Sequence, residues 1–221
     1  MNYQHHWVDG ERIDLPAGKV VCAGLNYALH AKEMNSQTAE DEPVLFIKPS
    51  TALRTLESPL NIPTGKGAVH HELEIAVLIG QTLCKATEAE ALQAVSGVGI
   101  GLDLTLRDLQ KQLKKAGRPW EKSKAFDGSC PLSCFVPIGQ CLPLNRLAIR
   151  LDINGQCRQQ GNSSDMLFPI PRLLVAISQH FTLLPGDIVL TGTPEGVGPL
   201  LSGDQLEISL DSLFGVNTVV V

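Results

Sequence analysis

Two glutamates spaced two residues apart, Glu72 and Glu74, are the part of the sequence that most strongly suggests chemistry. They stand at the start of an apolar run over residues 71–79 that predicts a strand, and residues two apart in a strand project from the same face. Because both faces of this run are otherwise apolar, the two like charges would repel and lose hydration unless a cation neutralised them. A bound divalent metal is one solution, and a strand end that emerges into solvent is the other.

Asp103 is the candidate for a third metal ligand, because it directly follows the apolar, glycine-rich run 98–102 at the end of an element, where sites are usually built. A ligand set made only of carboxylates selects hard ions, which here means Mg²⁺ or Mn²⁺ with Ca²⁺ as a substitute, rather than zinc, copper or iron–sulfur centres. Taken alone, Asp103 could equally cap a following helix.

The elements that must position these residues are short strands interspersed with a few helices. Apolar or alternating runs indicate strands, and 3.6-residue periodicity with capping signals indicates helices. The runs that favour strands lie at residues 19–23, 43–47, 71–79, 147–155, 188–191, 205–210 and 216–221, and the helical patterns lie at 26–34, 87–95, 106–116 and 171–180. No repeat or linker interrupts them. We therefore expect a polar lead-in over residues 1–16 and one continuous strand-rich domain over residues 17–221.

The amino-acid composition narrows the classes of partner that the protein could bind. A chain of 221 residues with 43% hydrophobic residues can bury a sizeable core. Its formal charge of −5 argues against a general nucleic-acid or membrane binder, and no apolar run approaches the ~18 residues that span a bilayer. The N-terminus lacks the pattern of a secretory signal, and Cys130 and Cys134 have no second Cys/His pair to form a zinc site. We expect a reduced, cytoplasmic protein.

Six segments resemble the fumarylacetoacetate hydrolase family, in matching order and spacing from about residue 19 to the C-terminus: GLNYALH at 24–30, LFIKPS at 45–50, HHELE at 70–74, LDLTLRD at 102–108, SKAFD at 123–127 and LTGTPEGVG at 190–198. The resemblance is strongest to the short single-domain branch of acylpyruvate hydrolases and oxaloacetate decarboxylases. It favours the metal interpretation of Glu72, Glu74 and Asp103. It also implies an α+β fold with a mixed β-sandwich or β-roll around the site, and a homodimer.

His30 and Glu33 are catalytic candidates. They lie at positions i and i+3 of the helix expected over residues 26–34, so they share a face. A glutamate can fix the tautomer of an imidazole and raise its basicity, which suits a general base, although a solvated helix face is the commoner fate of such a pair. The family resemblance implies that this pair activates water.

Lys124 is the third catalytic candidate, since the resemblance places a lysine here against the substrate oxygens beside the metal, where an ammonium would stabilise an enolate. Arg107 and Gln110 match positions that hold the substrate carboxylate, with an ordinary helix surface as the alternative. The remaining lysines of this stretch are expected to be solvated: Lys111, Lys114 and Lys115.

The loop over residues 191–198 lacks the Gly-Lys-Ser/Thr ending of a phosphate-binding loop, and no helical pattern follows it, which argues against nucleotide binding. We expect Thr193 in this loop to contact a carboxylate of the ligand. Lys48 resembles a family position that also binds substrate, though a lysine before proline could equally cap a strand at the surface. The polar loop over residues 36–42 could close over the site as a lid.

The resemblance implies a small 2-oxo acid as the substrate. Our leading hypothesis is metal-dependent hydrolysis of the C–C bond of an acylpyruvate, such as fumarylpyruvate or acetylpyruvate, to pyruvate and a carboxylic acid. Decarboxylation of oxaloacetate and isomerisation of an unsaturated 2-oxo dicarboxylate in aromatic catabolism are the enzymatic alternatives. A non-catalytic domain with a structural ion is a further one, although calcium proteins of that kind carry denser Asp/Asn/Gly loops.

Overall fold

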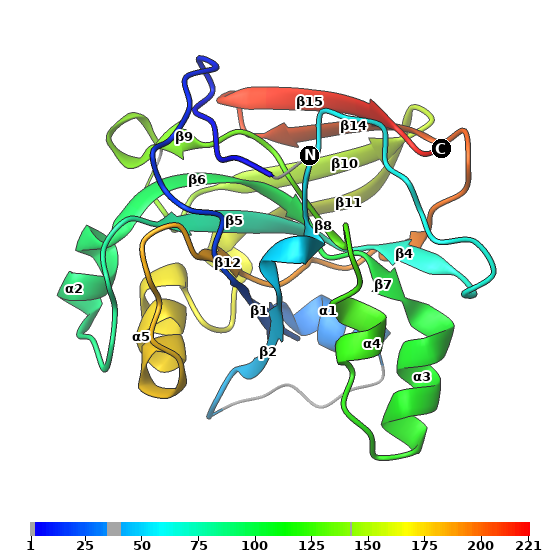
Figure 1. The fold of residues 1–221 in the computed structure, drawn as a ribbon, viewed down its shortest axis with the longest axis horizontal. Helices are drawn as coiled ribbons and strands as arrows, with labels where there is room; N and C mark the ends of the chain where they lie inside the picture. The colour runs from blue at the N-terminus through cyan, green and yellow to red at the C-terminus, as the bar shows by residue number, and fades with distance from the viewer. Residues whose placement is uncertain (1–2, 35–40, 142) are drawn as a thin grey trace.

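The computed structural model describes residues 3–34, 41–141 and 143–221 and contains three sheets (Figure 1). The largest runs in the order β2-β1-β12-β5-β6-β8-β3, with β9 paired to β6. Pairing is parallel between β1 and β12 and between β3 and β8, and antiparallel elsewhere, so the sheet is mixed. Its strands are β1 (Val20–Gly24), β2 (Val44–Lys48), β3 (Leu53–Thr55), β5 (Leu73–Ile79), β6 (Val95–Leu102), β8 (Cys130–Leu132), β9 (Val136–Pro137) and β12 (Ile188–Leu190).

Two smaller antiparallel sheets complete the strand layers. A four-stranded sheet consists of β11 (Gln156–Asn162), β10 (Ala148–Ile153), β14 (Gln205–Leu210) and β15 (Phe214–Val219) in that order. A three-stranded sheet consists of β13 (Gly198–Pro199), β4 (Val69–His71) and β7 (Thr105–Leu106). Figure 1 shows the four-stranded sheet lying over β5 and β6, and β10 and β14 contact these strands. The expected strand-rich α+β fold is therefore confirmed.

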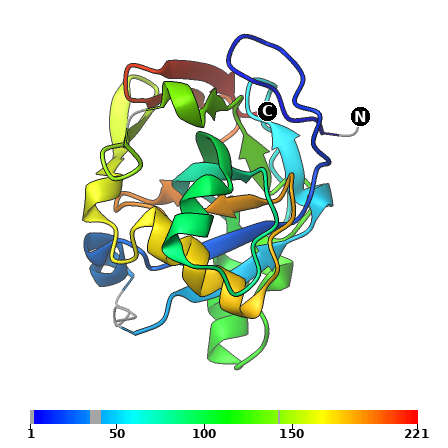
Figure 2. The same ribbon diagram turned by 90° about the vertical axis from the view of Figure 1, so that its left-hand side faces the viewer.

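Helices cover the remaining sides. They are α1 (Ala28–Glu33), α2 (Glu88–Gln93), α3 (Arg107–Lys115), α4 (Glu121–Lys124) and α5 (Ile170–His180), with 3-10 turns at Ser50–Ala52, Ile138–Gln140 and Ser163–Asp165. A capping box of Thr87 and Glu90 starts α2, which packs beside α5 on the side seen in Figure 2. Among the described residues, no helix has the length and apolar character needed to cross a membrane.

The central strand β5 is buried along its whole length and separates two parts of the core. Ile75 and Val77 belong to a cluster shared with β10 and β14, whereas Ala76 and Leu78 belong to one shared with β1 and β12. Glu74 lies on the same face of β5 as Ala76 and Leu78. Its side chain therefore points into the protein rather than into solvent.

The strand predicted over residues 71–79 is interrupted at one position. β4 ends at His71 and β5 begins at Leu73, and Glu72 connects them. The interruption arises because β4 pairs with β7 and β13, whereas β5 pairs with β12 and β6 of the large sheet. Residues 36–40 of the proposed lid loop lie outside the described residues.

Candidate active site

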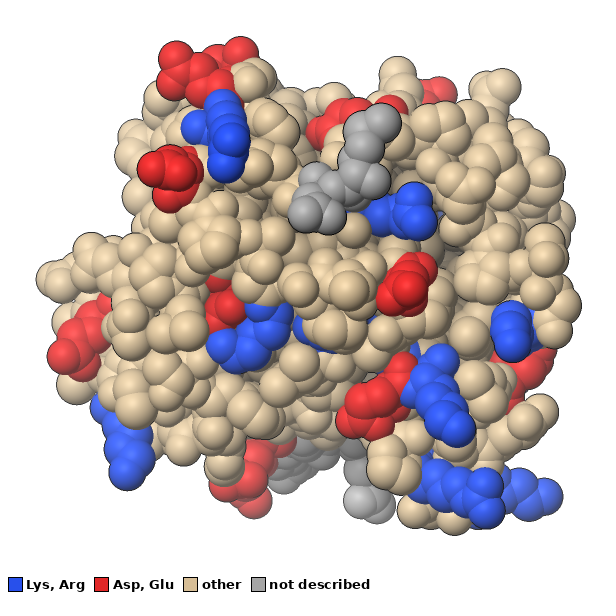
Figure 3. Space-filling view, in the orientation of Figure 1, with Lys and Arg blue, Asp and Glu red and all other residues tan. Residues whose placement is uncertain are grey.

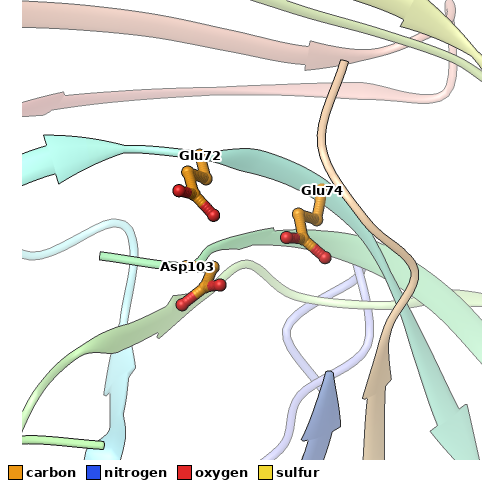
Figure 4. A group of neighbouring side chains, drawn as sticks. All are labelled: Glu72, Glu74 and Asp103. Carbon is orange, nitrogen blue, oxygen red and sulfur yellow. The ribbon is translucent and has the colours of Figure 1, made fainter. Parts of the chain in front are cut away.

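The three carboxylates predicted to be metal ligands converge at one point (Figure 4). Glu72 lies between β4 and β5, Glu74 on β5, and Asp103 directly after β6. The antiparallel pairing of β5 with β6 brings them together, and the main-chain N–H of Asp103 donates to the carbonyl of Glu72 at 2.8 Å. A ligand oxygen from each lies within 4.8 Å of the others, and the three residues are at most 5% exposed. The alternative of a strand end in solvent is therefore excluded.

The ammonium group of Lys124 lies between two of these carboxylates. Its Nζ is 2.7 Å from Oε2 of Glu72 and 2.5 Å from Oδ2 of Asp103, and it donates to the hydroxyl of Thr105 at 2.7 Å. Burial lowers the pKa of Lys124, but the charges of Asp103 and Glu72 outweigh burial and raise the pKa above its ordinary value. Lys124 is thus held as a cation next to the predicted metal ligands.

Glu74, in contrast, forms no ion pair with any described residue. The hydrogen bond that it accepts comes from the main-chain N–H of Gly192, at 2.6 Å. Burial, together with the charges of Asp103 and Glu72, raises the pKa of Glu74 well above its ordinary value. Three buried carboxylates, one of them without a counter-charge, form a set of hard oxygen donors that fits a divalent metal ion.

Arg107 and Gln110 lie on the first turns of α3 and are buried, which excludes the helix-surface alternative. Arg107 donates from Nη2 to Oε1 of Glu72 and from Nη1 to Oε1 of Gln110, the latter at 2.7 Å. Burial favours the neutral form of Glu72, but Lys124 and Arg107 outweigh burial and hold its pKa below the ordinary value. Since the oxygen of Gln110 is taken by Arg107, its NH₂ group is the part left to donate to a ligand.

Lys48 is completely buried, so it does not cap a strand at the surface. Its Nζ lies 2.8 Å from Oδ1 of Asp103 at an angle that makes an ion pair but no hydrogen bond. It donates to the carbonyl of Lys124, and to the carbonyl and hydroxyl of Ser129 at 3.1 and 3.0 Å. Lys48 is not among the residues that line the adjoining pocket, so it supports Asp103 from behind rather than facing a ligand.

A pocket opens beside the carboxylates, and His30, Lys124 and Thr193 line it together with them. His30 is buried, and its Nδ1 lies 3.2 Å from Oε2 of Glu33. The other oxygen of Glu33 accepts the main-chain N–H of Gly196 at 3.2 Å, which ties α1 to the loop over residues 191–198. The predicted His–Glu pair therefore exists, and its histidine lines the pocket.

Lys114 stands at the mouth of this pocket. It is exposed, as expected, but it also lines the pocket, with Nζ 4.7 Å from the centre of the Trp120 ring. Figure 3 shows basic side chains gathered at the lower right, over α3. Within the described part of the chain, Lys124 and Arg107 are paired with carboxylates, whereas Lys114 has no such pairing. It therefore offers an unneutralised positive charge to an entering ligand.

Sequence reasoning missed Gln159, a buried residue of β11 behind the pocket. Its Nε2 donates to the hydroxyl oxygen of Thr193 at 2.8 Å. The surrounding strand is polar and mostly exposed, so periodicity gave no sign that this one glutamine points inward. Its hydrogen-bond partners lie far away in the sequence, so only the folded structure identifies them.

Comparison with known proteins agrees with this fold. The family described as "Fumarylacetoacetate (FAA) hydrolase C-terminal" matches residues 19–221. The chain is 56% identical over 211 residues to oxaloacetate tautomerase YcgM of Escherichia coli K12, which covers 95% of each chain. A crystal structure of a fumarylacetoacetate hydrolase family protein from Yersinia pestis CO92 is 54% identical, with a TM-score of 0.96 over 99% of this chain and 100% of that one.

A second solved structure bears on the metal. The fumarylpyruvate hydrolase of Pseudomonas aeruginosa, crystallised with Mn²⁺ and pyruvate, is 33% identical, with a TM-score of 0.93 over 100% of this chain and 96% of that one. Three carboxylates that converge beside a pocket could hold a divalent metal ion. The chain belongs to the fumarylacetoacetate hydrolase family.

Proposed function

We propose that this protein is a divalent-metal enzyme that interconverts the enol and keto forms of oxaloacetate. The observation that carries the proposal is the convergence of three buried carboxylates on a pocket that His30 and Lys124 also line. The near full-length similarity to an oxaloacetate tautomerase supports this choice of reaction within the family.

Glu72, Glu74 and Asp103 would hold the ion. An all-carboxylate set favours Mg²⁺ or Mn²⁺, and the Pseudomonas aeruginosa relative contains Mn²⁺ with pyruvate. When bound, the ion would supply Lewis-acid polarisation of the 2-oxo group.

The charges of the site favour a dianionic substrate. When ionised, the three carboxylates carry as many negative charges as three buried cations carry positive ones, although the ion pairs of these cations go to Glu72 and Asp103: Lys48, Arg107 and Lys124. A divalent ion would leave two positive charges in a buried setting, which match the two carboxylates of oxaloacetate. Lys114 at the mouth adds a further positive charge that an anion would meet first.

The side chains can divide the remaining work among them. Thr193 and the NH₂ group of Gln110 donate hydrogen bonds to a substrate carboxylate, and the Lys124 ammonium stabilises negative charge on the 2-oxygen. In the direction from enol to keto, the enol O–H loses a proton and carbon 3 gains one. His30, oriented by Glu33, is the group placed to deliver a proton to that carbon.

Ultraviolet absorbance of the enol tests the proposal, because conversion to the keto form removes the conjugated C=C bond. We expect the protein with Mn²⁺ to accelerate this loss beyond Mn²⁺ alone, without release of pyruvate. The matched controls are EDTA-treated protein and the Glu74→Gln variant, which lacks one proposed ligand. Equal rates with EDTA and with Mn²⁺ would overturn the proposal.

Hydrolysis of an acylpyruvate is the second candidate, and the His30–Glu33 pair favours it because such a pair can also deprotonate water. The similarity to a fumarylpyruvate hydrolase supports it as well. Release of pyruvate from acetylpyruvate or fumarylpyruvate would indicate hydrolysis, and release of CO₂ from oxaloacetate would indicate decarboxylation. Tautomerisation releases neither product.

The homodimer stays a prediction, which light scattering tests.

A further inference from the structure

We propose that Gln159 is a positioning residue that fixes the hydroxyl group of Thr193 as a hydrogen-bond donor toward the substrate carboxylate. Gln159 is 1% exposed and does not line the pocket, so it would act on a ligand through a neighbouring residue, and Thr193 is a neighbour that does line the pocket. The inference rests on the proposed function, which places Thr193 against that carboxylate.

Two backbone groups fix the orientation of the Gln159 amide. Its Oε1 accepts the main-chain N–H of Leu73 at 2.9 Å, and a main-chain N–H can only donate. Its Nε2 lies 2.9 Å from the carbonyl oxygen of Pro194, which can only accept. Rotating the amide by 180° would place its NH₂ group against the N–H of Leu73 and its oxygen against the carbonyl oxygen of Pro194. The NH₂ group therefore faces the loop over residues 191–198.

This orientation determines what the Thr193 hydroxyl can do. The same NH₂ group lies 2.8 Å from Oγ1 of Thr193, so that oxygen accepts and its own proton must point elsewhere. Thr193 is buried and lines the pocket, and none of the described residues accepts its proton. The proton is thus available to an anion, in a charge-assisted hydrogen bond.

A local irregularity in β11 points Gln159 inward. Cys157 pairs with Asp152 and Gln159 pairs with Leu151, which leaves Arg158 as an extra residue in the ladder. Such a bulge changes the direction of the neighbouring side chains. Gln159 is accordingly the only fully buried residue of β11, all of which the structure describes.

Two glycines seat the loop over residues 191–198 against β11. Gly196 has a φ of +93°, and a Cβ atom there would lie 2.0 Å from the carbonyl oxygen of Arg158. A Cβ atom on Gly161 would lie 2.8 Å from the ring of Pro194. Loop and strand therefore meet backbone to backbone, which keeps the contact between Gln159 and Thr193 short.

A purely structural role for Gln159 is the alternative, because its Oε1 also lies 2.8 Å from Nδ1 of His71. Such a role predicts a loss of stability that does not depend on Thr193. The two roles are separated by a double-mutant cycle that measures the affinity for oxalate in the presence of Mn²⁺.

The cycle combines Gln159→Glu with Thr193→Val, and titration calorimetry reports the affinity for oxalate. A carboxylate at position 159 still accepts the N–H of Leu73 but cannot donate to Thr193, so the hydroxyl would turn to donate to it. We expect Thr193→Val to weaken oxalate binding by about ten-fold, since a hydrogen bond to a charged group is lost. Q159E should weaken binding at least as much, but by less than about three-fold when Val occupies position 193.

Gln160→Glu is the matched control, because Gln160 is the exposed neighbour and receives the same change of charge. It should leave oxalate affinity unchanged, and Mn²⁺ affinity is titrated separately in every variant. An equal effect of Q159E in both backgrounds would overturn the inference, whereas a Thr193→Val variant with normal oxalate affinity would instead overturn the proposed contact of Thr193. If Q159E does not fold, Gln159→Met takes its place in the cycle, and failure of both to fold assigns Gln159 to stability alone.

Discussion

The three proposed ligands are expected to respond differently to removal of charge, and Glu74 gives the sharpest contrast. In Glu74→Gln, the new amide oxygen can still accept the N–H of Gly192, and no described ion pair is broken. In Glu72→Gln, Lys124 and Arg107 both lose their partner. Both substitutions conserve size and remove one negative charge, so each serves as the control for the other.

The expected changes in the free energy of unfolding follow from the burial of each carboxylate and from its ion pairs. Removing one partner of a buried ion pair costs about 3–5 kcal/mol, so Glu72→Gln should lower the free energy of unfolding of the metal-free protein by about 3 kcal/mol. Glu74→Gln should change it by less than about 1 kcal/mol or raise it, because a buried charge without a counter-charge disappears. With Mn²⁺ at about 100 times its Kd, the wild-type protein should gain about 2.7 kcal/mol, and both variants should lose most of this gain.

Urea denaturation followed by circular dichroism, in EDTA and in MnCl₂, measures all of these quantities. The reasoning is refuted if Glu74→Gln destabilises the metal-free protein as much as Glu72→Gln. It is equally refuted if Glu74→Gln keeps the full stabilisation by Mn²⁺.

Three further predictions concern pH, selectivity and catalysis. Burial, together with the charges of Asp103 and Glu72, raises the pKa of Glu74 in the folded protein above the ordinary 4.5. As the pH rises, Glu74 therefore loses its proton in the unfolded chain before it does so in the folded protein. The metal-free wild-type protein should consequently lose stability relative to Glu74→Gln above about pH 4.5. Urea denaturation of both proteins across this range checks it, and a difference that does not change with pH contradicts it. Lys114→Gln should weaken binding of malate by up to about five-fold, the scale of an exposed ion pair, while leaving 2-hydroxybutyrate, which has a methyl group in place of the distal carboxylate, unaffected. Calorimetry with Lys115→Gln as the control measures this, and equal losses for both ligands would exclude a contact with the distal carboxylate. His30→Ala should bind Mn²⁺ normally yet lose about 10²–10⁴-fold in the rate of enol conversion, and full activity would remove His30 from the mechanism.

The spacing of the glutamates and their family pattern predicted which carboxylates would meet, but not the state of each one. Period-two alternation places Glu72 and Glu74 on one side of a chain segment whether or not that segment is covered. Their burial depends on β7, α3 and α4, which lie about 30–50 residues further along the chain. The sequence likewise could not show that Glu74 alone lacks a cationic partner.

The glycine-rich run before Asp103 lies where other parts of the backbone approach closely. A Cβ atom at Gly97 would lie 2.7 Å from the carbonyl oxygen of Val136, and one at Gly99 would lie 2.8 Å from that of Cys134. That the run forms the strand β6 was not predicted, because glycine is disfavoured in strands unless neighbours come this close. Gln159 escaped prediction for a related reason, since a bulge breaks the alternation from which burial is inferred.

Titration of oxalate against the protein in the presence of Mn²⁺ and in the presence of EDTA tests the central claim most directly. If Glu72, Glu74 and Asp103 hold an ion that recruits a 2-oxo acid, oxalate should bind with Mn²⁺ and not with EDTA, and oxalate should tighten Mn²⁺ binding by the same factor. Equal oxalate affinity with and without the metal would contradict the account.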